Sequence, residues 1–171
     1  MRPPSKHPAT IPPEELLAEC DVQRVRRSGP GGQRRNKVET GIVLTHSSSG
    51  LSVEASERRS QIENQRVALF RLRLKLAVQT RLPVQPDAAP SELWQSRRVG
   101  RRISVNSKHD DFPALLAEAM DVMTAYDMDL HAAADVLGTT QSQLTRLLKA
   151  EPQALSLVNR IRGELGRYRL R

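Results

Sequence analysis

The segment 28–37 reads Ser-Gly-Pro-Gly-Gly-Gln-Arg-Arg-Asn-Lys, and the rest of the chain is interpreted from it. Three of its first five residues are glycine, which reaches positive φ at little steric cost and lets the backbone come close to a partner. The amide side chain of Gln33 follows these glycines. Cationic side chains surround it: Arg24, Arg26, Arg27, Arg34, Arg35 and Lys37. This pattern predicts an exposed loop that faces an anion, most plausibly nucleic-acid phosphate.

Two other interpretations of this segment need to be weighed. A phosphate-binding P-loop requires Gly-Lys followed by Ser or Thr at the start of a helix, whereas here Gly32 is followed by Gln33. The P-loop interpretation therefore fails. A plain surface turn stays open as long as only the glycines and arginines are considered.

The charge of the 171-residue chain is unevenly distributed. Residues 22–108 contain 18 Lys and Arg against 6 Asp and Glu, whereas the whole chain carries a formal net charge of +8. A basic middle followed by a slightly acidic end indicates two units with different roles. Because only 3% of the residues are aromatic, contact with phosphates is favoured over stacking on bases.

Cysteine and histidine usage limits the chemistry. Cys20 is the only cysteine, so no intrachain disulfide and no cysteine-based zinc site is expected. A nucleophilic role for Cys20 is the alternative to a small, half-buried residue, which we favour because no His–Asp arrangement points to it. His109 and His131 have no partners at metal-ligand spacing, so no metal is expected. We see no apolar run of about 20 residues and no signal sequence, and we expect a cytoplasmic protein.

The local patterns predict an α+β domain in residues 14–82, after a proline-rich, disordered lead-in over residues 1–13. A strand is expected at 21–27, leading into the glycine loop. A β-hairpin follows from Gly41 to Ala55, with its turn at 47–50. A long helix, capped by Ser56, is expected to run to about Thr80. Its packing stripe is predicted to contain Ile62, Leu69, Phe70, Leu76 and Ala77.

Beyond this domain, residues 83–109 are interpreted as a linker and residues 110–171 as a helical module. The linker carries a basic run that is either a solvated tether or an RNA contact through Arg97, Arg98, Arg101 and Arg102. Four helices are expected in the module, with Gly138 ending the second and Thr140 capping the third. Residues 133–148 resemble a helix-turn-helix, which leaves nucleic-acid recognition and simple helix packing as alternatives.

Several motifs between about Val22 and Ala77 resemble the catalytic domain of the class I peptide-chain release factors. A Gly-Gly-Gln triplet alone is weak, but it gains specificity from the hairpin and from Arg-Ser-Gln before a helix. The matching positions are 28–33, Asn36, Lys37, Thr45, His46, Gly50, Glu54, 57–61 and Asn64.

The resemblance implies that the loop promotes attack of water on the ester that joins a nascent peptide to tRNA in the ribosome. Gly31 and Gly32 would supply the loop conformation. The backbone N–H of Gln33 would stabilise the developing charge, and its side chain would restrict the nucleophile to water. RNA contacts are implied for Arg27, Arg34, Arg35, Asn36, Lys37, Arg58, Arg59, Ser60, Gln61 and Asn64. The implied partners are large-subunit rRNA and peptidyl-tRNA, with a monomeric protein and no cofactor, metal or membrane.

The chain departs from the family pattern in two places. Arg34 and Arg35 stand where the family often has His and Val, and only about 21 residues precede the domain. With no room for a codon-reading region, the chain is more similar to the short, codon-independent ribosome-rescue hydrolases. Their basic tail enters the mRNA channel, a role that the 97–108 run would take here. An rRNA- or tRNA-binding protein without hydrolase activity is the alternative, and a DNA-binding regulator built on residues 110–166 is a distant third.

Overall fold

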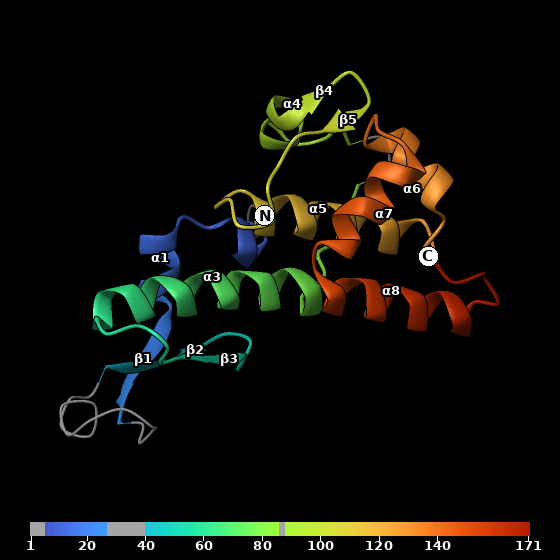
Figure 1. Ribbon diagram of the computed structural model, residues 1–171. Helices are drawn as coiled ribbons and strands as arrows, with labels where there is room; N and C mark the ends of the chain where they lie inside the picture. Colours follow the sequence, from blue (N-terminus) through green and yellow to red (C-terminus); the bar gives the residue numbers. More distant parts are fainter. Residues whose placement is uncertain (1–5, 27–39, 86–87) are drawn as a thin grey trace. The chain divides into compact units, whose positions relative to one another are not determined.

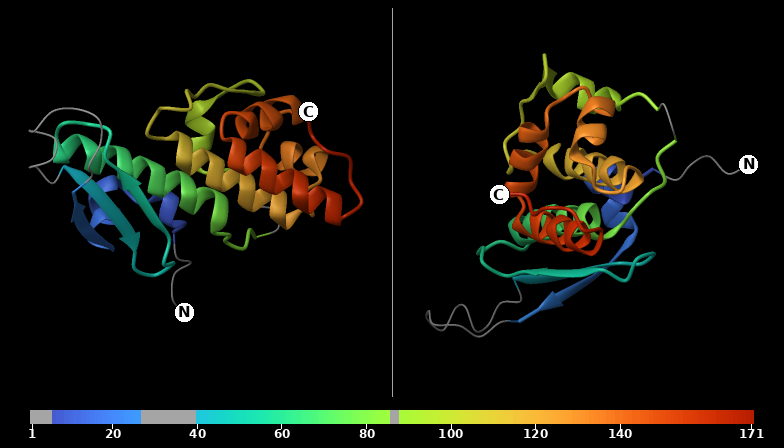
Figure 2. Two further views of the ribbon diagram at one scale, coloured as in Figure 1. Left: turned by 60° about the horizontal axis from the view of Figure 1, so that its bottom comes forward. Right: turned by 90° about the vertical axis from the view of Figure 1, so that its right-hand side faces the viewer.

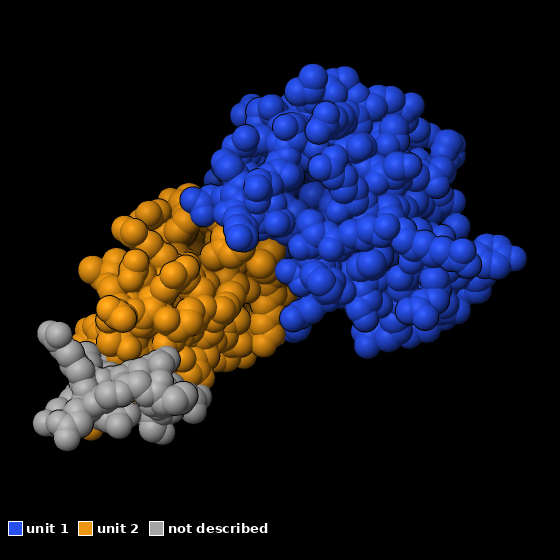
Figure 3. All heavy atoms as spheres, viewed as in Figure 1, with its two compact units in different colours: residues 1–10, 77–171 blue, residues 11–76 orange. Residues whose placement is uncertain are grey.

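The computed structural model describes residues 6–26, 40–85 and 88–171 of the chain. These residues form two compact units (Figure 3). Unit 2 comprises residues 11–76, and unit 1 comprises residues 1–10 together with 77–171. The expected mixture of helices and small antiparallel sheets is confirmed, and each unit is described by itself below.

Unit 2 contains a three-stranded antiparallel sheet in the order β1-β2-β3 (Figure 1). Strand β1 spans Cys20–Val25, β2 spans Gly41–His46 and β3 spans Ser52–Ala55. The expected hairpin is thus confirmed, and Gly50 adopts a φ of 68° in its turn. Leu44 lies opposite Val22 on one side and Val53 on the other. It is fully buried, whereas its partner Val22 is exposed.

One face of this sheet is covered by the long helix α3 (Gln61–Gln79), and the short helix α1 (Pro13–Ala18) precedes β1 (Figures 1 and 2). Lys75 of α3 donates from Nζ to the Ser52 carbonyl at 2.9 Å, which ties the helix to β3. The predicted stripe of α3 is confirmed at Leu69, Leu76 and Ala77, which are buried, and is wrong at Ile62, which is exposed. Further residues that the prediction omitted are also buried, as expected for neighbouring positions on one helix face: Asn64, Ala68, Leu72, Arg73 and Val78.

The predicted start of α3 was wrong by four residues, because a helix capped by Ser56 would begin at Glu57. Ser56 does not cap the helix, which begins at Gln61. The side chain of Asn64 binds the backbone of Arg58 and thereby holds the preceding residues in a non-helical conformation.

Residues 110–171 of unit 1 form four helices, as predicted: α5 (Phe112–Ala125), α6 (Leu130–Val136), α7 (Gln141–Lys149) and α8 (Pro152–Glu164). The predicted stop and cap are confirmed, since Gly138 has a φ of 62° and Thr140 accepts from the Gln143 N–H. The apolar faces meet in one core. Its largest fully buried side chains are Trp94, Phe112, Leu115, Leu116, Met120, Met123, Met128 and Leu137.

Residues 92–103, interpreted from sequence as part of a linker, form regular structure within unit 1. Helix α4 (Glu92–Arg97) is followed by a two-stranded hairpin of β4 (Arg98–Val99) and β5 (Arg102–Ile103). Trp94 anchors this segment, because it is fully buried and donates from Nε1 to the Leu137 carbonyl at 2.8 Å. A lone tryptophan in a proline-rich stretch was the overlooked signal for a packed element.

The proline-rich lead-in also contains structure. A 3-10 turn, η1 (Pro8–Thr10), follows the buried His7. One ring nitrogen of His7 lies 3.1 Å from the Thr80 carbonyl, and the other accepts from the Ala9 N–H. These contacts hold residues 7–10, which the prediction from proline content placed in a disordered segment, in a defined conformation.

Candidate functional site

The Gly-Gly-Gln segment connects β1 to β2, and the residues that flank it (Val25, Thr40 and Gly41, with Asn64 bound to Thr40) are called the loop frame below. In the β1–β2 pair, Val25 lies directly opposite Gly41, so the sheet brings the chain before and after the segment side by side. The segment itself lies outside the described residues. This includes the expected catalytic residues and five expected RNA contacts: Gly31, Gly32, Gln33, Arg27, Arg34, Arg35, Asn36 and Lys37.

Gly41 allows the two strands to close at this point. A Cβ atom at Gly41 would lie 2.7 Å from Cγ2 of Val25 and 2.9 Å from the Val25 carbonyl oxygen. Side chains do not tolerate such distances, so the close approach requires glycine. The requirement comes from close packing, because the φ of Gly41 is not positive.

Asn64 forms a clasp immediately beside this closure. Its amide nitrogen donates to the Thr40 carbonyl at 2.6 Å and to the Arg58 carbonyl at 3.0 Å. Its amide oxygen accepts from the Arg58 N–H at 2.8 Å. The side chain is completely buried, and its polar groups are satisfied internally. The expected RNA contact through Asn64 is therefore not supported: the residue ties Thr40, just after the Gly-Gly-Gln segment, to the start of α3.

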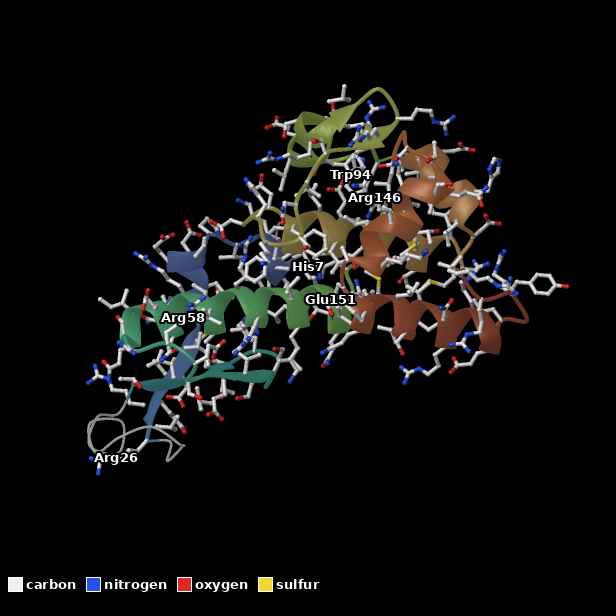
Figure 4. The ribbon with its side chains drawn as sticks, viewed as in Figure 1. His7, Arg26, Arg58, Trp94, Arg146 and Glu151 are labelled. Atoms are coloured by element: carbon white, nitrogen blue, oxygen red, sulfur yellow. The ribbon has the colours of Figure 1, made fainter. Side chains whose placement is uncertain are left out.

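The neighbouring residues 58–61 differ in accessibility. Arg58 and Arg59 are exposed, and Ser60 and Gln61 are half-buried. Among the described residues, neither the Arg58 nor the Arg59 guanidinium has a hydrogen-bond or ion-pair partner. Figure 4 shows Arg58 near the beginning of α3. Because the Asn64 clasp fixes the Arg58 backbone, this arginine pair is presented next to the loop frame with its charge free for a polyanion.

Two other residues of unit 2 have internal roles. His46 is buried, and its ring nitrogens lie 2.8 Å from Ser49 Oγ and 3.3 Å from a Glu19 carboxylate oxygen. Cys20 is half-buried, and its thiol donates to the Leu16 carbonyl. Burial, reinforced by the nearby Glu19 charge, raises the pKa of the Cys20 thiol. A raised thiol pKa disfavours the reactive thiolate, which agrees with the interpretation of Cys20 as a small, half-buried residue.

The basic run of unit 1 is largely held inside the unit. Arg97 forms an ion pair with Asp111, its Nε lying 2.8 Å from a carboxylate oxygen. Arg98 donates to the Gly138 carbonyl at 3.0 Å. Arg101 donates from Nε to the Thr139 carbonyl at 2.9 Å. These three arginines pin the hairpin to other parts of unit 1, which contradicts the interpretation of the run as a solvated tether. Their RNA contact stays a prediction.

Arg102 differs from the other three arginines. It is exposed, and within the described ranges its guanidinium has no partner. Sequence reasoning missed Arg146 of α7. This arginine is also exposed, and its guanidinium has no partner among the described residues. Together with Arg102 it lines a groove between the segment 102–109 and α7. Its position on the polar side of an amphipathic helix was the available signal, but the helix alone does not reveal the groove.

No metal centre is visible in the parts of the chain with a described structure, since they contain no group of three His, Cys, Asp or Glu side chains suited to a metal. His109 contacts Arg97 and the Asp111 backbone. Over the same parts, no helix is both long and apolar enough to cross a bilayer.

Comparison with known proteins shows which protein family the chain is similar to. The family model of the RF-1 domain matches residues 8–111. Over 68 residues the chain is 46% identical to the chloroplastic peptide chain release factor PrfB1 of Arabidopsis thaliana, covering 40% of this chain and 14% of that protein. Over 63 residues it is 44% identical to peptide chain release factor 1 of Chlorobaculum tepidum, covering 37% and 16% respectively.

A longer alignment exists with peptide chain release factor 1 of a Parafrankia strain, at 29% identity over 134 residues. It covers 74% of this chain and 36% of that protein. The chain thus spans well under half the length of these relatives. The matched region 8–111, more than half of the chain, contains the sheet, the Asn64 clasp and the Gly-Gly-Gln segment, and the chain belongs to the RF-1 domain family.

Proposed function

We propose that this protein binds the ribosome and promotes hydrolysis of the ester between a nascent peptide and tRNA. In this reaction water adds to the ester carbonyl carbon, the bond to the tRNA ribose oxygen breaks, and that oxygen takes up a proton. The free peptide and a deacylated tRNA are the products.

The observation that carries the proposal is the frame around Gly31, Gly32 and Gln33. The Val25–Gly41 closure and the Asn64 clasp hold both ends of this segment in a protein of the RF-1 domain family. A loop that presents a backbone donor to a reacting centre needs fixed ends, because any movement of the ends also displaces the donor at the tip.

Each residue type has a defined role in the proposed reaction. The glycines give the backbone access to the ester, and the Gln33 N–H stabilises the charge that develops on oxygen. One such donor in a site shielded from water contributes about 2.7–4 kcal/mol to transition-state stabilisation. Arg58 and Arg59 contact RNA phosphates beside the loop. The remaining parts of the active site would come from RNA, because no acid–base pair lies next to this segment among the residues that the structure describes.

The finer proposal is that release does not depend on a stop codon. It rests on the sequence resemblance to the short rescue hydrolases. The rescue hydrolases carry a basic tail that enters the mRNA channel, whereas residues 98–103 of this chain form a hairpin. Its residues Arg98 and Arg101 are hydrogen-bonded to carbonyls within unit 1. We therefore assign no role in the mRNA channel to this hairpin.

A peptide-release assay tests both levels of the proposal. Purified ribosomes carrying a labelled peptidyl-tRNA are prepared with an empty A site, a stop codon or a sense codon. We expect release with the empty A site that a stop codon does not increase. A Gly32→Ala variant should release peptide at least about 100-fold more slowly. Gly163→Ala is the matched control, because a Cβ at Gly163 meets no atom within 4 Å.

Each outcome has a defined meaning. Release only with a stop codon would support peptide release and reject codon independence. Equally slow release by the wild type and by Gly32→Ala would reject hydrolysis. The alternative function, RNA binding without hydrolysis, is favoured by Arg34 and Arg35 after Gln33, where the family often has His and Val. Salt-sensitive co-sedimentation with ribosomes in the absence of release would support that alternative.

A further inference from the structure

Unit 1 contains an open groove of about 540 Å³ between the segment 102–109 and helix α7. We infer that this groove binds the phosphodiester backbone of RNA. The inference goes beyond peptide release, because it concerns a surface of unit 1, whereas the Gly-Gly-Gln segment belongs to unit 2, and it stands whether or not the protein is a hydrolase.

The first argument is the state of the charges in the groove. Arg102 projects from β5 and Arg146 from α7, and both are exposed and line the groove. Within the described residues, neither guanidinium has a hydrogen-bond or ion-pair partner. The other arginine in its wall, Arg97, is already bound to Asp111. Two unpaired guanidinium groups facing one groove match phosphate oxygens, which accept two parallel hydrogen bonds from an arginine.

The second argument is the polarity of the remaining wall. Gln143 accepts from the Ile103 N–H at 3.2 Å through its amide oxygen, and its amide nitrogen is a donor with no partner among the described residues. Ser104, Asn106 and Ser107 add small polar side chains, and no Asp or Glu lines the groove. Donors without acidic competitors form a surface for an anion. In the sequence, the basic Lys108 and Lys149 stand beside the lining residues Ser107 and Ala150, and the acidic Asp110 and Glu151 stand beside the lining residues His109 and Ala150. The excess positive charge of the groove therefore comes from Arg102 and Arg146.

The third argument concerns the kind of nucleic acid. In a DNA-binding helix-turn-helix, residues near the start of the second helix enter the major groove and read bases. Here the preceding turn and the first turns of α7 are covered by the hairpin, because Thr139 is bonded to Arg101 and Gln143 to Ile103. The exposed cations lie instead at Arg146 and Lys149, toward the end of α7. This arrangement favours contact with a backbone over readout of duplex bases.

The positions that define the groove come from segments far apart in sequence. Figure 4 shows Arg146 and Trp94 on the part of unit 1 that carries the hairpin. Trp94 fixes α4, and Arg98 and Arg101 fix the hairpin through the Gly138 and Thr139 carbonyls. The pinned Arg98 and Arg101 thus hold the hairpin that carries Arg102, and Arg102 and Arg146 are left to bind the ligand.

Salt-dependent binding of the full-length protein tests the inference. The probe is a fluorescein-labelled 16-nucleotide single-stranded polyuridine, titrated between 50 and 200 mM KCl. Arg102→Gln/Arg146→Gln is compared with Arg160→Gln/Arg169→Gln, which makes the same charge change at exposed positions outside the groove. Equal thermal melting curves confirm that both variants fold. Unit 2 provides the same binding background in every variant.

For single strands, each phosphate contact contributes about 0.7 to the slope of log affinity against log salt. Loss of two contacts should lower the slope by about 1.4, whereas the control should retain the wild-type slope. The wild type's affinity advantage over the groove variant should then be about sevenfold larger at 50 mM than at 200 mM KCl.

A second measurement locates the RNA. Crosslinking with 4-thiouridine-substituted RNA and mass spectrometry should yield peptides from 102–109 or 143–150, and the groove variant should lose them. An unchanged slope together with crosslinks confined to unit 2 would overturn the inference. Tighter binding of a 16-base-pair DNA duplex, or displacement of RNA by inorganic phosphate at equal ionic strength, would also overturn it in favour of a DNA or small-anion site.

Discussion

Arg101 and Thr139 bind each other reciprocally across 38 positions of sequence. The Arg101 guanidinium donates to the Thr139 carbonyl at 2.9 Å through Nε, and the Thr139 hydroxyl donates back to the Arg101 carbonyl at 2.7 Å. Thr139 is completely buried in the turn between α6 and α7. Its hydroxyl therefore binds the backbone of the β4–β5 hairpin. This bond explains why a polar residue occupies a turn position at which helix-turn-helix motifs usually have an apolar one.

Replacement of Thr139 by valine tests this relationship. The side chain keeps its shape but leaves the Arg101 carbonyl without its donor. We expect unit 1 to lose about 1–3 kcal/mol of unfolding free energy, the usual effect of an unsatisfied buried group. Urea unfolding followed by Trp94 fluorescence measures this loss, since Trp94 is the only tryptophan. Thr145→Val is the control, because its hydroxyl bonds only within α7. Equal losses in both variants would contradict a specific role for Thr139.

We expect the substitution Asn64→Asp to lower the stability of unit 2 strongly, because it breaks the hydrogen bonds of the Asn64 clasp. Asn64→Asp keeps the size of the side chain but replaces the donor to the Thr40 and Arg58 carbonyls with an acceptor. We expect unit 2 to lose about 2–5 kcal/mol of unfolding free energy, because a buried amide network is broken. Hydrogen exchange of the backbone amides of β1 and β2 reports this loss.

Gln65→Glu provides the matched control for Asn64→Asp, since it makes the same chemical change at the next, half-buried position of α3. Its effect should stay within about 0.5 kcal/mol. If the proposed function holds, Asn64→Asp should also slow peptide release at saturating ribosomes, measured well below the unfolding temperature. Wild-type exchange rates in Asn64→Asp would show that the clasp does not stabilise the loop frame.

Gly41 should not tolerate a larger side chain. The Cβ of Gly41→Ala would meet the Val25 carbonyl oxygen at 2.9 Å, and backbone atoms cannot easily move away. Overpacking of this kind lowers unfolding free energy by about 1–3 kcal/mol. Thermal unfolding detects the loss. Gly163→Ala lies in α8 with open space around it, so it should leave stability unchanged or raise it by up to about 1 kcal/mol. A Gly41→Ala protein as stable as the wild type would disprove the close approach.

His7 predicts a pH dependence of unit 1. Burial lowers the pKa of His7 from its usual 6.5, partly opposed by the Thr80 carbonyl and the Asp121 carboxylate, while Arg81 lowers it further. A lowered pKa in the folded state means that the unfolded chain binds the proton more readily. The stability that His7 contributes is therefore present above pH 6.5 and is lost as the pH falls through the lowered pKa.

The measurement compares melting temperatures of the wild type and His7→Gln between pH 8 and pH 5. The wild type should lose stability more steeply below about pH 6.5, because the variant has no group to protonate at this position. Asp121, whose pKa is raised mainly by burial, is present in both proteins. Parallel curves would show that burial does not hold His7 neutral in the folded protein.

Local patterns in the sequence were sufficient for most elements of secondary structure. The hairpin at 41–55 and the four helices of unit 1 follow from alternation, helical periodicity and caps such as Thr140, all of which act between residues close in sequence. The Gly-Gly-Gln triplet, together with the hairpin and the Arg-Ser-Gln before a helix, also identified the family without any structure. The start of α3 and the hairpin at 98–103 could not be predicted in this way, because Asn64 and Trp94 determine them through contacts made only after folding.

The roles of the charged and polar residues divide in the same manner. The sequence by itself determined that the chain has a basic middle, a catalytic-type loop motif and a helical end. Only the tertiary structure decided that Asn64 is a buried clasp, that Arg97, Arg98 and Arg101 are pinned, and that Arg102 meets Arg146 in a groove. The physical reason is that an arginine or an asparagine has the same sequence signature whether its hydrogen bonds go to water, RNA or a distant carbonyl, and the fold alone selects the partner.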